Sequence, residues 1–268
     1  MNYRQVVFSF LFLFICAQSS ESAQSLLDHS QWDQLLKKNV HQGLVDYETL
    51  RQNRSELDEY LNQLENYPLD SFTRLSREDR LAFWINLYNA SMIRMIVDES
   101  PLQSISEIPA VFKIRTVRVI GEYFSLSELL NNVLRNGFKD ERILTALVSG
   151  RMDSPRLLSE AFKGDQIDEQ LDRAAHEFAE NEVLNQITPG SKKIQLSPLF
   201  QQFGADFLLN YSAARETPFS AKESAVIGFL LHHLTDPDKR IFLDSAHYKI
   251  EYLPEDPRLN AVSLSKKA

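Results

Sequence analysis

Residues 81–90 read Leu-Ala-Phe-Trp-Ile-Asn-Leu-Tyr-Asn-Ala, and this stretch decides what kind of fold the chain can form. Its apolar side chains leave no polar face, so a helix through these residues would be apolar on all sides. A globular protein buries such a helix in its core. Ser76, followed three residues later by Asp79, is typical of a capped helix start. The sequence therefore predicts a buried central helix over residues 76–99.

Two amides interrupt this apolar helix. Asn86 and Asn89 stand three residues apart and therefore on one face of it. An amide buried without hydrogen-bond partners costs a few kcal/mol, so both side chains need polar neighbours. Two interpretations stay open: the pair lines a ligand-binding cleft, or it satisfies backbone groups within the core.

The segments around the central helix are helices and short strands. Leucines at helical spacing predict helices over residues 25–40 and 47–66, and alternating residues predict a hairpin strand over 114–120. Residues 142–148 suit either a strand or a buried helix. Towards the C-terminus we expect helices over 165–186 and 221–234, and strands over 193–196, 241–243 and 248–253. Because these elements are segregated and do not alternate as βαβ units, the expected fold is α+β, a single domain with a small, mostly antiparallel sheet.

The first residues of the chain predict export. Residues 6–17 (VVFSFLFLFICA) form an apolar run that follows Arg4 and precedes small residues up to Ala23. This order is typical of a cleaved signal peptide, and the run is too short for the roughly 20 residues of a membrane-spanning helix. We therefore expect a signal peptide over residues 1–23 and a folded domain over residues 24–268. A periplasmic or secreted location and no membrane span follow.

Composition excludes two classes of function. The single cysteine, Cys16, lies within the predicted signal peptide, so the mature chain has no thiol for a disulfide, a nucleophile or a zinc site. The 29 basic and 37 acidic residues give a net charge of −8. Such a chain lacks the basic surface that a phosphate backbone requires, so nucleic acid is not an expected partner.

Several motifs together resemble a bacterial and plant family called domain of unknown function 547. The longest is Phe-Trp-Ile-Asn-Leu-Tyr-Asn-Ala at residues 83–90, and Gly-Leu-Val-Asp-Tyr at residues 43–47 lies upstream of it. Further similar segments are residues 140–143, 150–157, 196–200 and 206–207. The resemblance runs in order from about Trp32 to Asn260 and so covers most of the mature chain.

The resemblance implies a thiol site that this chain lacks. Typical members pair a histidine in the middle motif with a cysteine in the following loop, as in a papain-like or transglutaminase-like active site. Here Leu144 stands at the histidine position and Ser154 at the cysteine position. The terminal motif is also altered, to Glu-Asp-Pro-Arg-Leu-Asn at residues 255–260. A serine hydroxyl needs a strong, positioned base, so losing both partners predicts loss of the thiol chemistry.

The sequence also offers candidates for a nucleophile and for ligand-binding residues. Ser154 is a weak candidate for a nucleophile, because a serine before a proline is more often a turn residue. Arg142 either pairs with Asp46 or Asp140, or binds the carboxylate of a ligand. The candidate ligand-binding residues are Asn86, Asn89, Arg142 and Asp256.

No metal site or cofactor is predicted. His232 and Asp236 are four residues apart, a spacing that can hold a metal on a helix, but Pro237 takes Asp236 out of helical geometry. No third ligand is near them in the sequence. A histidine could serve as a general base only if folding brings its ring nitrogen within about 3 Å of the Ser154 hydroxyl.

Three hypotheses of function follow from these residues. The first is an exported, non-catalytic member of the family that binds a small molecule or an envelope protein. The second is a hydrolase or acyl-transfer enzyme that uses Ser154, or a carboxylate such as Asp153 or Asp256, with a histidine brought near by folding. The third is a purely structural envelope protein.

Overall fold

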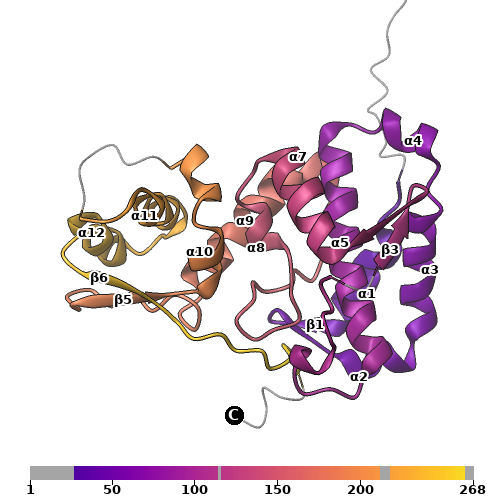
Figure 1. Cartoon of the computed structure of the whole chain (residues 1–268), viewed down its shortest axis with the longest axis horizontal. Coiled ribbons are helices and arrows are strands. Elements are labelled where there is room, and N and C mark those ends of the chain that lie inside the picture. Colours follow the sequence, from indigo (N-terminus) through magenta and orange to yellow (C-terminus); the bar gives the residue numbers. More distant parts are fainter. Residues whose placement is uncertain (1–26, 114–115, 212–217, 263–268) are drawn as a thin grey trace, which may run out of the picture.

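The central helix organises the N-terminal part of the fold. The structure is a computed structural model that describes residues 27–113, 116–211 and 218–262. In it, α5 (Arg77–Glu99) lies among the helices of the N-terminal part (Figure 1). The hydroxyl of Ser76 accepts a hydrogen bond from the backbone N–H of Asp79 at 2.9 Å and so caps the helix. Every residue from Leu81 to Ile93 is buried, which confirms the predicted central helix.

The elements before α5 contribute to the first hydrophobic core, and two of their helices, at residues 47–52 and 54–65, pack against α5. Trp32 and Tyr60 stack in this core, with ring centroids 5.5 Å apart. Gly43, at φ +81°, makes the turn between the first two strands, a conformation that glycine adopts readily. These elements are α1 (Ser30–Asn39), β1 (Val40–His41), β2 (Leu44–Val45), α2 (Tyr47–Gln52), α3 (Arg54–Glu65) and α4 (Leu69–Arg74).

The elements after α5 continue the first core and lead into the second. Ser125 starts the helical stretch that follows the second hairpin, and its side chain forms a reciprocal capping box with Glu128. A π-helical stretch, η2, then packs on α5. In chain order the elements are η1 (Ile105–Glu107), β3 (Thr116–Val119), β4 (Glu122–Ser125), α6 (Leu126–Glu128), η2 (Leu129–Arg135), α7 (Asn136–Phe138), α8 (Ile143–Ala146), η3 (Gly164–Gln166) and α9 (Ile167–Glu180).

The C-terminal elements form a second hydrophobic core beside the first (Figure 1). Phe200, Phe207 and Phe229 meet at its centre, with ring centroids 5.0 to 5.8 Å apart. The helix α9 belongs to both cores, because Leu171 packs in the first and Phe178 in the second. The remaining elements are β5 (Lys193–Leu196), α10 (Pro198–Phe203), η4 (Asp206–Leu209), α11 (Ala221–His233), α12 (Pro237–Ser245) and β6 (Lys249–Tyr252).

The described strands form three separate pairs. Pairs β1–β2 and β3–β4 are antiparallel, whereas β5 and β6 pair in parallel. The expected α+β class with mostly antiparallel pairing is confirmed. The strand expected over residues 241–243 is wrong, because these residues lie in α12. Asp236 accepts hydrogen bonds from the N–H groups of Asp238 and Lys239, and Pro237 occupies the first helical position, so the helix start outweighs the β-rich sequence.

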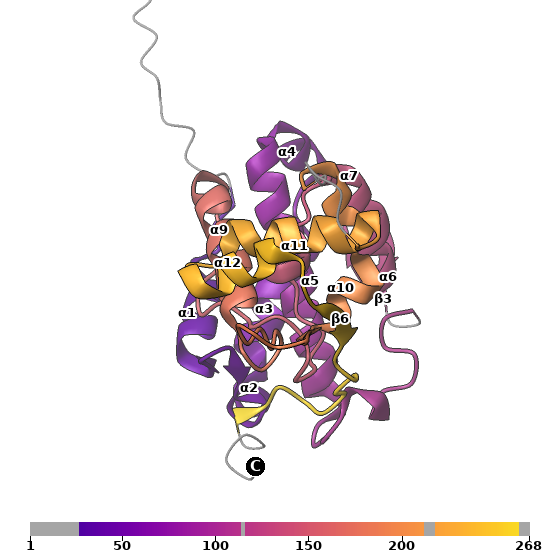
Figure 2. The same cartoon turned by 90° about the vertical axis from the view of Figure 1, so that its left-hand side faces the viewer.

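A C-terminal segment, residues 253–262, connects the two cores. It runs from β6 back to the first core and is yellow in Figures 1 and 2. At its start, the N–H of Leu253 donates to the carbonyl of Leu196, at 2.8 Å. At its other end, the carbonyl of Asn260 accepts from the N–H of Val45, at 2.9 Å. The segment therefore fixes the two cores relative to each other.

The described helices include no candidate for crossing a membrane. Within residues 27–113, 116–211 and 218–262, no helix has both the length and the apolar character that a bilayer requires. The predicted signal peptide, residues 1–23, lies wholly outside the described residues, so the structure does not test it.

Candidate functional site

A pocket of about 430 Å³ lies where the two cores and the C-terminal segment meet. Its volume is within the range of about 300 to 1,000 Å³ that small-molecule sites occupy. The helices α5, α8 and α10 and the π-helix η2 each contribute to its wall, as do the loop after α8 and Glu255 of the C-terminal segment. The lining residues are Tyr88, Phe112, Lys113, Ser127, Leu130, Asn131, Leu144, Leu147, Val148, Ser149, Arg151, Asp153, Ser154, Pro155, Pro198, Leu199, Gln202, Phe203 and Glu255.

Leu144 and Ser154, the positions at which the family resemblance implies histidine and cysteine, both line this pocket. Both are buried, with 3% and 8% of their surfaces exposed. The Ser154 hydroxyl donates to the carbonyl of Pro155, at 3.1 Å. In the part of the chain that the structure describes, which includes all six histidines, no histidine nitrogen forms a hydrogen bond with Ser154. The geometry therefore gives this hydroxyl no general base.

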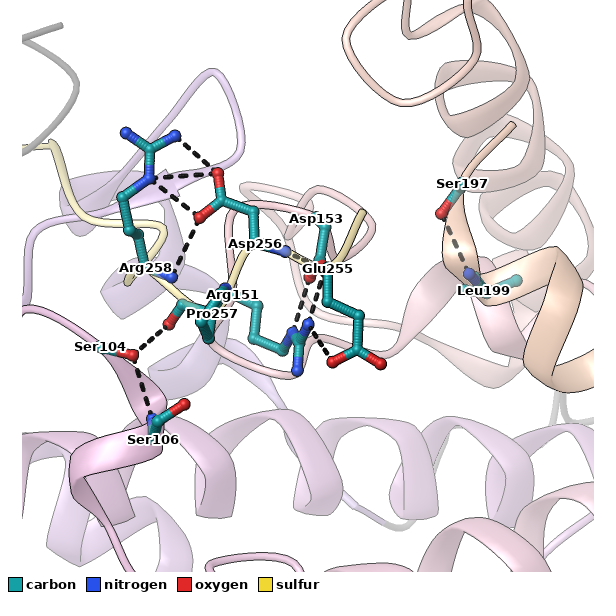
Figure 3. Close-up of polar contacts among 10 residues, drawn as sticks. All are labelled: Ser104, Ser106, Arg151, Asp153, Ser197, Leu199, Glu255, Asp256, Pro257 and Arg258. Carbon is teal, nitrogen blue, oxygen red and sulfur yellow. Dashed lines mark hydrogen bonds and ion pairs between the residues drawn. The ribbon is translucent and has the colours of Figure 1, made fainter. Parts of the chain in front are cut away.

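Arg151 and Asp153 form a rigid pair in the pocket wall (Figure 3). Arg151 Nε and Nη2 donate to the two carboxylate oxygens of Asp153, each at 2.7 Å. The hydrogen bonds that Arg151 donates to Asp153 raise the pKa of Arg151 and keep it charged. Asp153 Oδ2 also accepts the backbone N–H of Asp256, at 2.6 Å. Both oxygens of Asp153 are thus occupied, which disfavours this carboxylate as a nucleophile.

Glu255 adds a second carboxylate to the same arginine. Its Oε2 accepts from Arg151 Nη2 at 3.0 Å, and 73% of the Glu255 side chain is exposed. Sequence reasoning singled out neither Arg151 nor Glu255, although both lie in motifs that it quoted. The two adjacent carboxylates, Glu255 and Asp256, gave no sign of which one would reach the pocket.

Asp256, a predicted ligand-binding residue, is next to the pocket and does not line it. Its carboxylate accepts three hydrogen bonds from the side chain of Arg258, and these bonds hold its pKa below the usual range. Nearby, the carbonyl of Pro257 accepts from the Ser104 hydroxyl at 2.8 Å (Figure 3). This geometry favours a role for Asp256 in shaping the C-terminal segment.

Asn86 and Asn89 also lie outside the pocket, and each amide bridges two backbone groups. Asn86 Nδ2 donates to the carbonyl of Phe162 at 2.8 Å, and its Oδ1 accepts the N–H of the same residue at 3.0 Å. Asn89 Nδ2 donates to the carbonyl of Ala146 at 2.9 Å, and its Oδ1 accepts the N–H of Val148 at 3.0 Å. Both side chains are at most 1% exposed. The geometry favours the second interpretation, in which they satisfy backbone groups in the core.

The comparison with protein families adds one finding. Residues 72–179 match the family described as "Protein of unknown function, DUF547". This segment of the chain is therefore similar to the DUF547 family. The match begins in α4 and ends in α9, so it includes both Leu144 and Ser154. It does not include α10 or Glu255, which complete the pocket. Neither curated proteins nor solved structures give a match, so the papain-like or transglutaminase-like architecture stays a prediction.

Arg142, within the matched DUF547 segment, pairs with carboxylates of this chain. Its Nη2 lies 2.8 Å from both Asp140 and Asp168, and its Nη1 lies 2.6 Å from Asp172. The hydrogen bonds that Arg142 donates to the Asp140 carboxylate are the main cause of its raised pKa. Of the two partners expected, Asp140 is found, whereas Asp46 caps α2 instead. The arginine therefore joins α8 to α9, which favours its structural role.

A second cleft, of about 730 Å³, is lined by the residues just before α8 and by residues of α11 and α12. Glu141 lines it, is 4% exposed and accepts a hydrogen bond from Asn210 Nδ2 at 2.7 Å. Burial raises the pKa of Glu141 and lowers the pKa of the nearby His233 to about 4. In the sequence, Glu141 stood out only as part of the family motif at residues 140–143, with no role of its own. Among the described residues there is no group of three or more histidine, cysteine, aspartate or glutamate side chains placed to hold a metal.

Proposed function

We propose that this protein is an exported, non-catalytic binder of a small molecule, and that the ligand occupies the pocket of about 430 Å³. One observation carries the proposal: Leu144 and Ser154 line the same pocket. The resemblance implies a histidine and a cysteine at these two positions, but the lining of this pocket has neither an imidazole nor a thiol. A ligand can still enter such a cavity, but the chemistry implied by the resemblance has no reacting groups there.

The composition of the wall supports binding of a ligand with an apolar body. Leu130, Leu147, Leu199 and Phe203 line the pocket together with serine, asparagine and glutamine side chains. Small-molecule sites typically combine an apolar lining with a few polar groups that orient the ligand. A purely structural envelope protein would have no need of a cavity of this kind.

Narrowing the pocket should weaken binding. We expect Leu199→Trp, in the wall of the pocket, to weaken the binding of 1-octanol at least about tenfold, because the indole would fill space that the probe needs. Nuclear magnetic resonance titration of the leucine methyl groups measures the affinity and locates the probe. The matched control is Leu209→Trp, since Leu209 is 68% exposed and does not line the pocket.

Ser154→Ala separates binding from catalysis in the same experiment. We expect it to leave the affinity within about twofold and ester hydrolysis at the background rate, because a hydroxyl without a base is a poor nucleophile. Either of two results would contradict the proposal. In the first, 1-octanol changes the chemical shifts only of methyl groups outside the pocket, or still changes those of the pocket in Leu199→Trp. In the second, the wild type has a hydrolytic activity that Ser154→Ala removes. The second result would favour the hydrolase hypothesis.

Export is a separate part of the proposal with its own test. If residues 1–23 act as a signal peptide, the mature N-terminus should lie between Gln18 and Gln24. N-terminal sequencing of the protein from the cell envelope or the medium measures this directly. Full-length protein starting at Met1 in the cytoplasm would be incompatible with export.

A further inference from the structure

We infer that the pocket takes a small organic acid with an apolar body, and that the ligand's carboxylate replaces Glu255 on Arg151. This inference rests on the proposed binding function and specifies its ligand class. Glu255 would then act as an internal competitor, an anion of the protein that occupies the arginine while the pocket is empty.

The two carboxylates on Arg151 are held in very different ways. The side chain of Asp153 is 9% exposed and binds the guanidinium through two parallel hydrogen bonds. Glu255 makes a single bond of 3.0 Å and is 73% exposed. Because exposed ion pairs contribute little and buried bidentate pairs are geometrically fixed, Glu255 is the partner that can be displaced.

Arg151 keeps donors for a ligand. Its hydrogen bonds use Nε and Nη2, and within the described part of the chain Nη1 donates no hydrogen bond. Arginine presents its donors in a planar fork that matches a carboxylate. A ligand carboxylate can therefore contact Nη1 together with the Nη2 position that Glu255 now occupies.

The charges of the lining residues favour an anion once Glu255 leaves. The pocket is lined by two cations, Lys113 and Arg151, and two anions, Asp153 and Glu255, so its charge is zero. Moving Glu255 into solvent leaves a charge of plus one (two minus one). A ligand carboxylate restores neutrality, whereas a cationic ligand would find the remaining carboxylate, Asp153, already bound on both oxygens.

The rest of the wall suits a hydrocarbon body. Leu144, at the position where the resemblance implies an ionisable histidine, adds an apolar side chain next to Leu147 and Leu199 in the same lining. Apolar area removed from water contributes about 25 cal/mol per Å², so an acyl chain gains affinity that a short, polar acid lacks. Both parts of the ligand thus have a defined counterpart in the wall.

Three probes of equal length test the ligand class: octanoate, 1-octanol and octylammonium. We expect octanoate to bind wild-type protein at least about fivefold more tightly than 1-octanol, and added salt to weaken only octanoate. Glu255→Gln should tighten octanoate binding about three- to tenfold and leave 1-octanol within about twofold, because it removes the competing anion. The matched control, Glu251→Gln, removes an exposed carboxylate that pairs with Lys193 outside the pocket and should change neither affinity.

The outcomes distinguish this inference from the proposed function. Equal affinities for octanoate and 1-octanol, both lost in Leu199→Trp and both unchanged in Glu255→Gln, would overturn the carboxylate inference and leave the binding function intact. Tightest binding of octylammonium would overturn it as well. If no probe changes the chemical shifts of the methyl groups that line the pocket, the proposed function itself is wrong. Thermal melts of both glutamine variants establish that their folds are comparable.

Discussion

Replacing Trp84 with alanine should lower the free energy of unfolding by about 3 to 5 kcal/mol, as deletions of large aromatic side chains in cores do. Trp84 is 8% exposed, and its ring meets Phe72, Phe83 and Phe124 edge to face, with centroids 5.5, 5.2 and 6.0 Å away. No small side chain can keep these contacts. Chemical denaturation followed by circular dichroism measures the difference.

An exposed aromatic provides the control for this measurement. Tyr123, in β4, is 66% exposed, so Tyr123→Ala should change the unfolding free energy by no more than about 0.5 kcal/mol. A loss below about 1 kcal/mol for Trp84→Ala would mean that this ring is not part of the core in solution, and a ligand-facing role would have to be considered.

Asn89→Leu should destabilise the protein by about 2 to 6 kcal/mol, because each buried polar group left without a partner costs about 1 to 3 kcal/mol. The substitution leaves two such groups, the carbonyl of Ala146 and the N–H of Val148. These residues flank Leu147, which lines the pocket. We therefore expect the variant to lose affinity for the octyl probes as well as stability.

Asn62→Leu is the matched control for this change. Asn62 is exposed on α3, and its side-chain oxygen accepts from Asn66, which is also exposed. Because water can replace that hydrogen bond, we expect a change within about 0.5 kcal/mol. If Asn89→Leu costs no more than this control, the amide bridge does not hold the loop, and the ligand-binding interpretation of Asn89 becomes the better one.

The sequence predicted the central helix because two independent local signals agree there. The cap at Ser76 marks the start, and apolar residues on all sides of the helix from Leu81 onwards require burial. The strand predicted over residues 241–243 is wrong, because this β-rich triplet lies inside a helix that starts from Asp236 and Pro237. A short triplet is weak evidence of a strand, since its neighbours along the chain decide which structure it joins.

Of the candidate site, only residues in or next to the family motifs could be predicted from the sequence. Leu144 and Ser154 were compared because both lie in family motifs, and they line one pocket. Arg151 and Glu255 are 104 residues apart, and their pairing depends on the path of the C-terminal segment. Local patterns carry no information on such a contact, because it is set by tertiary packing.

The C-terminal segment has a consequence for how fast the protein folds. The hydrogen bond from the Tyr47 hydroxyl to Asn260 joins residues 213 positions apart, and its length is 2.6 Å. Contacts between such distant residues slow folding far more than they affect stability, since the chain must close a very long loop before they form. We expect residues 253–262 to dock late, after both cores have formed. If the chain is exported as proposed and crosses the membrane unfolded, this segment would dock after translocation. Glu255 would then join the pocket wall only outside the cytoplasm.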